Sequence, residues 1–447
     1  MRGVLFGEGA HRPGLMVAHA THIGFAVTIG LKRRTKHGLL EAERERRRLA
    51  KQGPHGRHEE QPRGYHRGYR IAGQAQHRQL TQLAEPGRLP RFHPHLLENQ
   101  RTAFLRKHAA QMIVFHTIMQ PGDNFISANK LYGGSINQFG HAFKNFDWHV
   151  RWVDPTNPDE IEQQIDDRTR AIFIESLANP GGTFVDIKAI ADIAHKHGLP
   201  LIVDNTMASP YLLRPIEHGA DVVVHSMTKF IGGHGNSMGG VIVDGGTFNW
   251  SESGKYPMLS EPRPEYGGMV LHETFGNFGF AIACRVLGLR DLGPALSPFN
   301  AFMLLTGVET LPLRMQKHCD NALEVATWLK GHDKVSWVSY SGLEDDPNHA
   351  LMKKYSPNGA GAVFTFGLKG GFDAGVTFVE SLEVFSHLAN IGDTRSLVIH
   401  PASTTHRQLS PEQQVAAGAG PDVVRLSIGI EDAADIIGDL EQALAAV

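Results

Sequence analysis

Through most of this chain, short apolar segments that end in polar residues alternate with segments of helical periodicity. Six segments fit buried strands: residues 124–129, 149–154, 171–176, 201–205, 221–225 and 240–244. Three others repeat apolar side chains at helical spacing: residues 108–119, 158–165 and 186–197. Strands that alternate with helices predict an α/β fold with a mostly parallel sheet. Such sheets bind ligands at the carboxyl ends of their strands, so the polar residues there are the first candidates for a functional site.

A second, smaller α/β region is predicted after Phe299. A long helical stretch begins there and runs through Leu311 towards Leu329. Strands near residues 335–340 and 362–368 and helices near residues 372–382 and 432–444 follow it. We therefore expect a large domain over residues 108–300 and a C-terminal domain over residues 301–447.

Residues 1–107 differ in composition from the rest of the chain. They hold 21 Lys and Arg against 8 Asp and Glu, whereas residues 108–447 hold 23 against 38. They also contain 10 of the 26 histidines and no aspartate, tryptophan or cysteine. Three interpretations remain open: a reading-frame error upstream of His108, a disordered tail, or a basic arm that binds polyanions. We favour the frame error. We do not expect a nucleic-acid partner, because the Arg-rich run at residues 41–51 has no interleaved aromatic residues.

Composition also excludes several classes of protein. The chain has no run of about 18 apolar residues, so we expect no transmembrane helix and no membrane partner. Cys284 and Cys319 are the only cysteines, too few for a disulfide framework or a zinc site. We expect a cytoplasmic protein that binds no metal.

Residues that can carry chemistry follow two neighbouring strand candidates. Asp204 comes near the end of the segment at 201–205, and Lys229 follows the next strand together with Ser226 and Thr228. Pyridoxal 5'-phosphate (PLP) needs a lysine for a Schiff base, a carboxylate for its pyridine nitrogen, and hydroxyl and N–H donors for its phosphate. Alone, the lysine would be a surface residue and the aspartate a turn residue. Together they predict a PLP enzyme whose Schiff-base lysine is Lys229.

Residues 108–447 resemble the Cys/Met-metabolism PLP enzymes, the cystathionine γ-synthase-like family of fold-type I. The resemblance rests on HAAQ (108–111), KLYGGSINQF (130–139), ESLANPGG (175–182), VDNTMASPYLLRP (203–215), HSMTKFIGGHG (225–235), GDTRSLVIHPASTTH (392–406) and VVRLSIGIED (423–432). It implies a fold-type I PLP-dependent transferase, with a PLP-binding domain at 108–300 and a smaller C-terminal α/β domain.

The same resemblance implies catalytic and cofactor-binding roles for matching residues. Lys229 would form the Schiff base and move protons, and Tyr132 would stack on the cofactor ring and assist proton transfer. Asp204 would pair with the pyridine nitrogen, and Asn179 would hydrogen-bond the phenolic oxygen of the ring.

Further matching residues would hold the phosphate and the substrate. Ser226 and Thr228 would contact the phosphate of the cofactor. Arg425 would bind the substrate carboxylate through its guanidinium fork, with help from Asn390 and Ser396.

Within the family, the chain is most similar to the O-acetylhomoserine sulfhydrylase (aminocarboxypropyltransferase) branch. This implies γ-replacement in methionine biosynthesis and trans-sulfuration, in which sulfide or a thiol displaces acetate from O-acetyl-L-homoserine to give homocysteine or methionine. Residues 132–135 are Tyr-Gly-Gly-Ser and lack the cysteine usual in methionine γ-lyases. Cystathionine γ-synthase and methionine γ-lyase activities remain alternatives. The resemblance also implies a homo-oligomer, a dimer or a homotetramer, with sites at the dimer interface.

The resemblance stops abruptly at His108. Family members carry Ser-Gly immediately before this helix, where the pair cradles the phosphate, whereas this chain has Arg106 and Lys107. These side chains would offer charge to the phosphate but not the same backbone geometry. We therefore expect weakened PLP affinity, and an inactive chain is a further alternative.

Overall fold

The computed structural model describes residues 101–447, apart from residues 105, 179–180 and 409. The three interpretations of the basic N-terminal region therefore fall largely outside the described residues, as does the role expected of Asn179. The described residues all belong to one compact unit.

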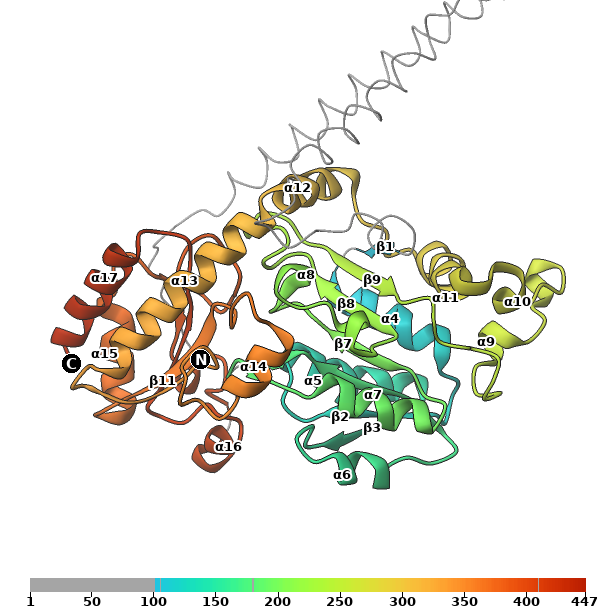
Figure 1. Ribbon diagram of the computed structural model, residues 1–447, viewed down its shortest axis with the longest axis horizontal. Helices are drawn as coiled ribbons and strands as arrows, with labels where there is room; N and C mark the ends of the chain where they lie inside the picture. Colours follow the sequence, from blue (N-terminus) through green and yellow to red (C-terminus); the bar gives the residue numbers. More distant parts are fainter. Residues whose placement is uncertain (1–100, 105, 179–180, 409) are drawn as a thin grey trace, which may run out of the picture. The chain divides into compact units, whose positions relative to one another are not determined.

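A seven-stranded sheet forms the first part of the described fold (Figure 1). In spatial order its strands are β1 (Arg101–Phe104), β9 (Gly240–Asp244), β8 (Val222–Ser226), β7 (Leu201–Asp204), β4 (Thr169–Glu175), β2 (Asn124–Ala128) and β3 (His149–Val153). The five strands from β8 to β3 run parallel, which confirms the mostly parallel sheet. β9 breaks this pattern, because it is antiparallel to both of its neighbours, so that β1 at the edge runs in the same direction as the five parallel strands. Regular structure thus begins before His108, where the sequence resemblance begins.

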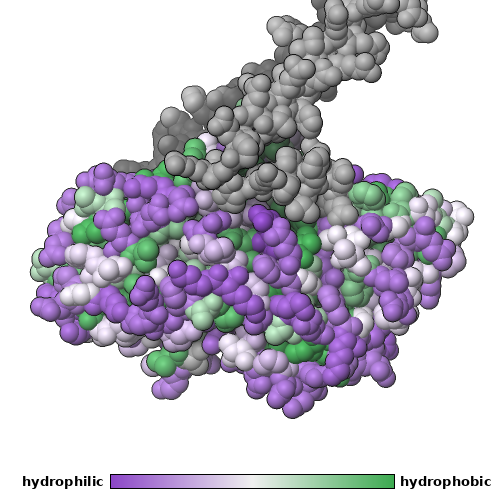
Figure 2. Space-filling view, viewed as in Figure 1, coloured by the Kyte–Doolittle hydropathy of each residue, from purple (hydrophilic) through white to green (hydrophobic). Residues whose placement is uncertain are grey.

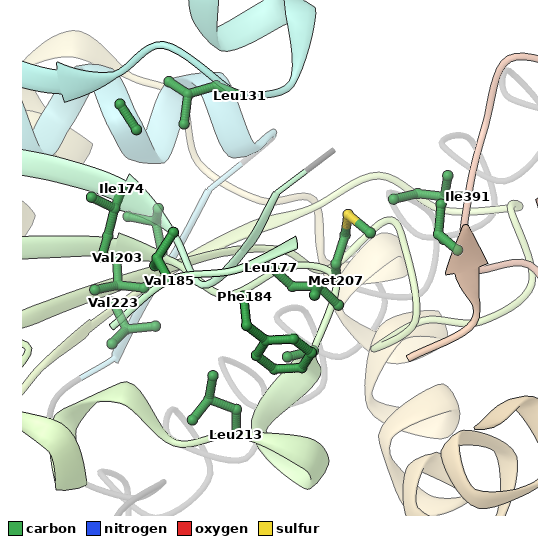
Figure 3. Close-up of a cluster of buried hydrophobic side chains, with 14 of the residues drawn as sticks. Leu131, Ile174, Leu177, Phe184, Val185, Val203, Met207, Leu213, Val223 and Ile391 are labelled. Carbon is green, nitrogen blue, oxygen red and sulfur yellow. The ribbon is translucent and has the colours of Figure 1, made fainter. Parts of the chain in front are cut away.

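The central strands are mostly apolar and almost wholly buried, because helices cover both faces of the sheet (Figure 1). The helices of this part are α4 (Lys107–Ile118), α5 (Gly133–Gly140), α6 (Pro158–Gln163), α7 (Ile187–Lys196), α8 (Ser209–Leu212), α9 (Pro257–Ser260), α10 (Leu271–Phe275) and α11 (Gly279–Ala283). Figure 3 shows Ile174, Val203 and Val223, from three adjacent strands, within one buried cluster. The short pair β5 (Leu177–Ala178) and β6 (Thr183–Phe184) follows β4.

The sequence from Pro298 onward supplies a long helical stretch and a second sheet. The sheet has the order β10 (Val335–Ser339), β11 (Val363–Leu368), β14 (Val423–Ser427), β13 (Leu397–Ile399) and β12 (Ser386–His387). The helices are α12 (Pro298–Glu309), α13 (Leu311–Lys330), α14 (His349–Tyr355), α15 (Gly371–Ser381), α16 (Pro411–Ala416) and α17 (Ala433–Ala445). The single stretch expected from Phe299 to Leu329 is divided at Thr310, because Pro312 is tolerated only in the first turn of a new helix.

Hydrophilic residues dominate the face drawn in Figure 2, and hydrophobic residues form separate patches on it. Among residues 101–447, outside the few that are not described, no helix combines the length and the apolar character needed to cross a membrane.

Candidate active site

A cavity of about 170 Å³ lies where the carboxyl ends of β4, β7 and β8 approach β14 of the second sheet. Its lining combines charged, polar and apolar residues. The lining residues are Arg106, Lys107, His108, Tyr132, Glu175, Leu177, Asp204, Thr206, Met207, Ser226, Thr228, Lys229, Met238, Ala389, Asn390, Ile391 and Arg425. Figure 3 shows Leu177, Met207 and Ile391 among the buried apolar side chains. The sheet topology predicts this place, because ligands bind beyond the carboxyl ends of parallel strands.

Asp204 is the last residue of β7 and is almost fully buried. One carboxylate oxygen, Oδ1, accepts hydrogen bonds from the backbone N–H of Thr206, at 3.0 Å, and from the hydroxyl of Thr206. The other oxygen, Oδ2, lies 2.6 Å from Nζ of Lys107. Thr206 therefore fixes the orientation of the carboxylate and leaves Oδ2 as the oxygen that faces a cationic partner.

Lys229 lies in the turn after β8, and its Nζ donates a hydrogen bond to Oδ1 of Asn390. Burial, together with the nearby charges of Lys107 and Arg425, lowers the pKa of Lys229 to about 8. A larger fraction of this amine is therefore neutral near pH 7 than for an ordinary lysine. A neutral amine is the form that attacks a carbonyl carbon and that accepts a proton.

Lys107 is the first residue of α4, and only 7% of its surface is exposed. Besides Asp204, its Nζ contacts Oγ of Ser135 at 3.1 Å and lies 4.6 Å from the centre of the Tyr132 ring. Burial alone would lower the pKa of Lys107, but the charges of Asp204 and Glu175 outweigh it and raise the pKa above the ordinary lysine value. Lys107 is therefore a buried cation at neutral pH.

Tyr132 immediately precedes α5, and 40% of its surface is exposed. Its backbone N–H donates to Oε1 of Glu175, the last residue of β4, at 2.9 Å. Its ring lies 5.9 Å from the ring of His108, measured between centroids. Glu175 thus holds the start of α5, and with it the Tyr132 ring, at the mouth of the cavity.

Arg425 comes from β14 of the second sheet and faces the same cavity. Its Nη2 donates to the backbone oxygen of Asn390 at 3.2 Å. Burial lowers the pKa of Arg425 to about 10, which still leaves it charged at neutral pH. A guanidinium inside a largely enclosed cavity is suited to binding a carboxylate.

The remaining predicted residues differ in how they relate to the cavity. Ser226 and Thr228 line it, and the hydroxyl of Thr228 accepts a hydrogen bond from the N–H of Gly239 at 3.1 Å. Ser396 does not line the cavity, since its hydroxyl donates to Glu431 at 3.0 Å and accepts from the N–H of Gly429 at 2.9 Å.

The cavity also contains polar residues whose contacts the sequence interpretation does not predict. Lys107 was expected to offer charge to a phosphate, but it contacts Asp204. Glu175 and Thr206 were not singled out, although both lie at strand ends, as Asp204 does. The position of Glu175 as the polar end of an apolar strand is the signal that identified Asp204, and it would have identified Glu175 as well.

A family model for "Cys/Met metabolism PLP-dependent enzyme" matches residues 97–445. The chain belongs to this family. The match begins a few residues before β1 and excludes almost all of the basic N-terminal region. The fold-type I architecture and the PLP dependence expected from the sequence are thereby confirmed.

Relatives with an assigned activity cover the same part of the chain. An O-acetyl-L-homoserine sulfhydrylase from Leptospira meyeri is 48% identical over 345 residues, which are 75% of this chain and 78% of the relative. A homocysteine synthase from Schizosaccharomyces pombe is 48% identical over 338 residues, 75% of this chain and 79% of the relative.

A crystal structure from Campylobacter jejuni is similar to the fold described here. It is assigned as an O-acetylhomoserine (thiol)-lyase and carries N'-pyridoxyl-lysine-5'-monophosphate. It is 38% identical, with a TM-score of 0.75, and the match covers 79% of this chain and 84% of that one.

The residues around the cavity fit PLP in most respects. Lys229 offers an amine of lowered pKa, Tyr132 an aromatic face, and Ser226 and Thr228 lie together at the end of β8. Asp204 offers a buried carboxylate for the pyridine nitrogen. However, Oδ1 of this carboxylate is bound by Thr206, and Oδ2 is paired with Lys107. The donor set is therefore that of a PLP site in which one protein cation contacts a group that the cofactor would use.

Proposed function

We propose that this protein catalyses γ-replacement on O-acetyl-L-homoserine. Sulfide would form the new Cγ–S bond while the Cγ–O bond breaks, so that acetate leaves and homocysteine forms; methanethiol would give methionine. The observation that carries the proposal is the convergence of the Lys229 amine, the Asp204 carboxylate and the Arg425 guanidinium on one cavity. The relatives assigned as O-acetyl-L-homoserine sulfhydrylase and homocysteine synthase support the choice of substrate and product.

PLP, when bound, would withdraw electrons from the Cα atom of the amino acid attached to it. Lys229 would hold the cofactor through Nζ, and the same amine, with its pKa lowered to about 8, would accept and return protons during turnover. Asp204 would keep the pyridine nitrogen protonated, and Tyr132 would cover the ring. Asn179, outside the described residues, keeps its proposed contact to the phenolic oxygen as a sequence-based assignment.

Arg425 would bind the carboxylate of the amino acid by a charge-assisted pair. Asn390 supports this arrangement on both sides, because its side chain contacts Lys229 and its backbone oxygen contacts Arg425. Ser396 would act through its neighbours, since its hydroxyl holds Gly429 and Glu431.

The test supplies the full-length protein with PLP and measures the product formed from each defined combination of substrates. O-acetylhomoserine with sulfide is expected to give homocysteine, with much less product from O-succinylhomoserine or from cysteine in place of sulfide. Release of methanethiol from methionine alone would favour a γ-lyase, and cystathionine from O-succinylhomoserine and cysteine would favour a γ-synthase. Either result, without homocysteine formation, contradicts the proposal.

We further propose that the protein self-associates through α12. Phe299, Phe302 and Leu305 point away from the core of their own chain, with exposed fractions of 71%, 64% and 66%, and Leu313 nearby is 71% exposed. Four large apolar side chains exposed together are typical of a surface that another subunit covers. A dimer or a homotetramer in the cytoplasm is the assembly that we propose.

A further inference from the structure

The cavity holds an ammonium group that the proposed reaction does not use. Lys107 extends from the first turn of α4 and places Nζ 2.6 Å from Asp204 and 3.9 Å from Glu175. The side chains of all three residues are almost fully buried, with exposed fractions of 8% for Lys107, 1% for Asp204 and 5% for Glu175. This is a buried ion pair with a second carboxylate beside it.

The two oxygens of the Asp204 carboxylate have different hydrogen-bond partners. Oδ1 already accepts from the backbone N–H and the hydroxyl of Thr206. Oδ2 accepts from Lys107. A pyridine nitrogen that approaches Oδ2 therefore meets the ammonium of Lys107 at a distance of 2.6 Å from the same oxygen.

Tyr132 is in the same situation as Asp204. Nζ of Lys107 lies 4.6 Å from the centre of its ring, within the range of a cation–π contact. The two groups assigned to the cofactor ring, the carboxylate and the aromatic face, are thus both engaged by one lysine. Removal of a partner from a buried ion pair leaves an uncompensated charge, so Lys107 does not leave Asp204 without cost.

We propose that Lys107 is an intramolecular competitor of the cofactor: its ammonium holds Oδ2 of Asp204, and PLP binds only when the ring nitrogen replaces it there. The carboxylate of Glu175, 3.9 Å away, offers the displaced ammonium a second partner within the cavity. This inference rests on the assignment of PLP as the cofactor. It replaces the expectation that Lys107 serves the phosphate.

The experiment measures binding rather than turnover, with two probes and the full-length chain. One probe is PLP, and the other is pyridoxine 5'-phosphate, which lacks the aldehyde and cannot bond covalently to Lys229. Lys107→Ala is expected to tighten the binding of both probes by about tenfold to a hundredfold. The apparent affinity of a site is proportional to the fraction of molecules in which the site is open, and the variant would raise that fraction. Lys107→Met, which keeps most of the length of the side chain without its charge or its hydrogen-bond donors, should tighten binding in the same direction.

Arg106→Ala is the matched control. Arg106 is exposed, lines the same cavity and precedes Lys107 in the chain. Its removal takes away a positive charge near the site without freeing Asp204, so it is not expected to tighten binding. Tightening by both variants alike would mean that general charge, and not competition at Asp204, is responsible, and it would overturn the proposal.

Coupling between the two residues gives the sharpest comparison. In an Asp204→Asn background, Lys107→Ala should no longer tighten the binding of pyridoxine 5'-phosphate, since the shared partner is gone. Weaker binding of both probes by Lys107→Ala in the native background would show that the ammonium serves the phosphate, and unchanged binding would show that Lys107 does not limit access. Either result overturns the proposal. Failure of the proposed γ-replacement would instead leave cofactor binding intact and appear only as missing homocysteine.

Discussion

At the scale of single residues, the cavity contains two lysines whose pKa values move in opposite directions. Burial is the largest influence on both, and it disfavours the charged form of each. Lys107 remains charged because two carboxylates, Asp204 and Glu175, lie beside it. Lys229 has the cations Lys107 and Arg425 as neighbours instead, so its amine loses its proton more easily. The positions of four charges therefore decide which of the two lysines loses its proton more easily.

This difference predicts how Lys229 reacts in the cofactor-free protein. With a pKa of about 8, the neutral and reactive fraction of its amine should rise as the pH increases through about 8. Modification by a small amine reagent, followed by peptide mass spectrometry, measures that rate at each pH. Lys354 is the control, because its pKa is raised by its hydrogen bond to Asp186 and its reaction should begin only at higher pH. Equal pH profiles for the two lysines would contradict the electrostatic account.

Arg425 carries the second prediction at this scale. Arg425→Lys keeps the charge but loses the planar fork, so kcat/KM for O-acetylhomoserine should fall by roughly tenfold to a hundredfold. The comparison variant is Arg395→Lys. Arg395 forms an ion pair with Asp393, but its side chain is 64% exposed, so little change in kcat/KM is expected. Equal kcat/KM values for the two variants would remove Arg425 from substrate binding.

How far the sequence could predict the site depends on the kind of contact. Asp204 and Lys229 were predictable, because each ends or follows an apolar strand and because parallel strands bring their carboxyl ends together. The contact between Lys107 and Asp204 was not, because the two residues are 97 positions apart and depend on how α4 packs on β8 and β9. Long-range pairings of this kind leave no periodic pattern in the sequence.

At the scale of elements, α12 is held against the loop that carries Lys229. An added Cβ on Gly307 would meet the backbone oxygen of Gly232 at 2.3 Å, well inside contact distance. Gly232 in turn donates its N–H to the carbonyl of Met227 at 2.8 Å, which closes the turn around Lys229. α12 and the turn around Lys229 therefore fit together only because position 307 lacks a side chain.

Gly307→Ala should accordingly destabilise the fold by about 1–3 kcal/mol, since the clash is with backbone that cannot rotate away. The free energy of unfolding, measured by denaturant titration, gives this value. Gly438→Ala in α17 is the control, because nothing lies within 4 Å of its added Cβ. That change should be neutral or stabilise the protein by up to about 1 kcal/mol through helix propensity. Equal effects would show that α12 does not pack closely against the loop.

Element boundaries were predicted less well than element types. The six strand candidates of the large sheet all form strands, and all of them except the edge strand β3 are buried along most of their length. The direction of β9 was not predictable, since an apolar strand looks the same in either orientation. The division of the long helix at Thr310 had a local signal in Pro312, which the continuous periodicity on both sides concealed.

At the scale of the whole molecule, the described residues of α12 expose the apolar surface through which we propose that the protein self-associates. The residues on α12 are more exposed than hydrophobic side chains of that size usually are in a monomer. The proposed boundary between the domains at 108–300 and 301–447 falls within α12, which packs through Gly307 against the loop that carries Lys229. A partner that covers α12 would thus lie close to the turn that holds Lys229.

Phe302→Glu should therefore reduce the mass of the protein in solution towards that of the monomer, because a buried interface does not tolerate an unpaired charge. Light scattering after size-exclusion chromatography measures the mass. Val415→Glu on α16 serves as the control, since Val415 is 63% exposed and lies away from α12 in the sequence. An unchanged mass for the Phe302 variant, or an equal loss for both, would place the interface elsewhere.

The central claim, that Lys229 is the residue that holds PLP, is tested most directly by trapping. The full-length protein is incubated with PLP, reduced with borohydride and digested, and the pyridoxyl-modified lysine is located by peptide mass spectrometry. The account predicts one modified lysine, Lys229, and loss of the modification and of the visible absorption band in Lys229→Ala. Modification of Lys107 instead, or an unchanged pattern in Lys229→Ala, would contradict it.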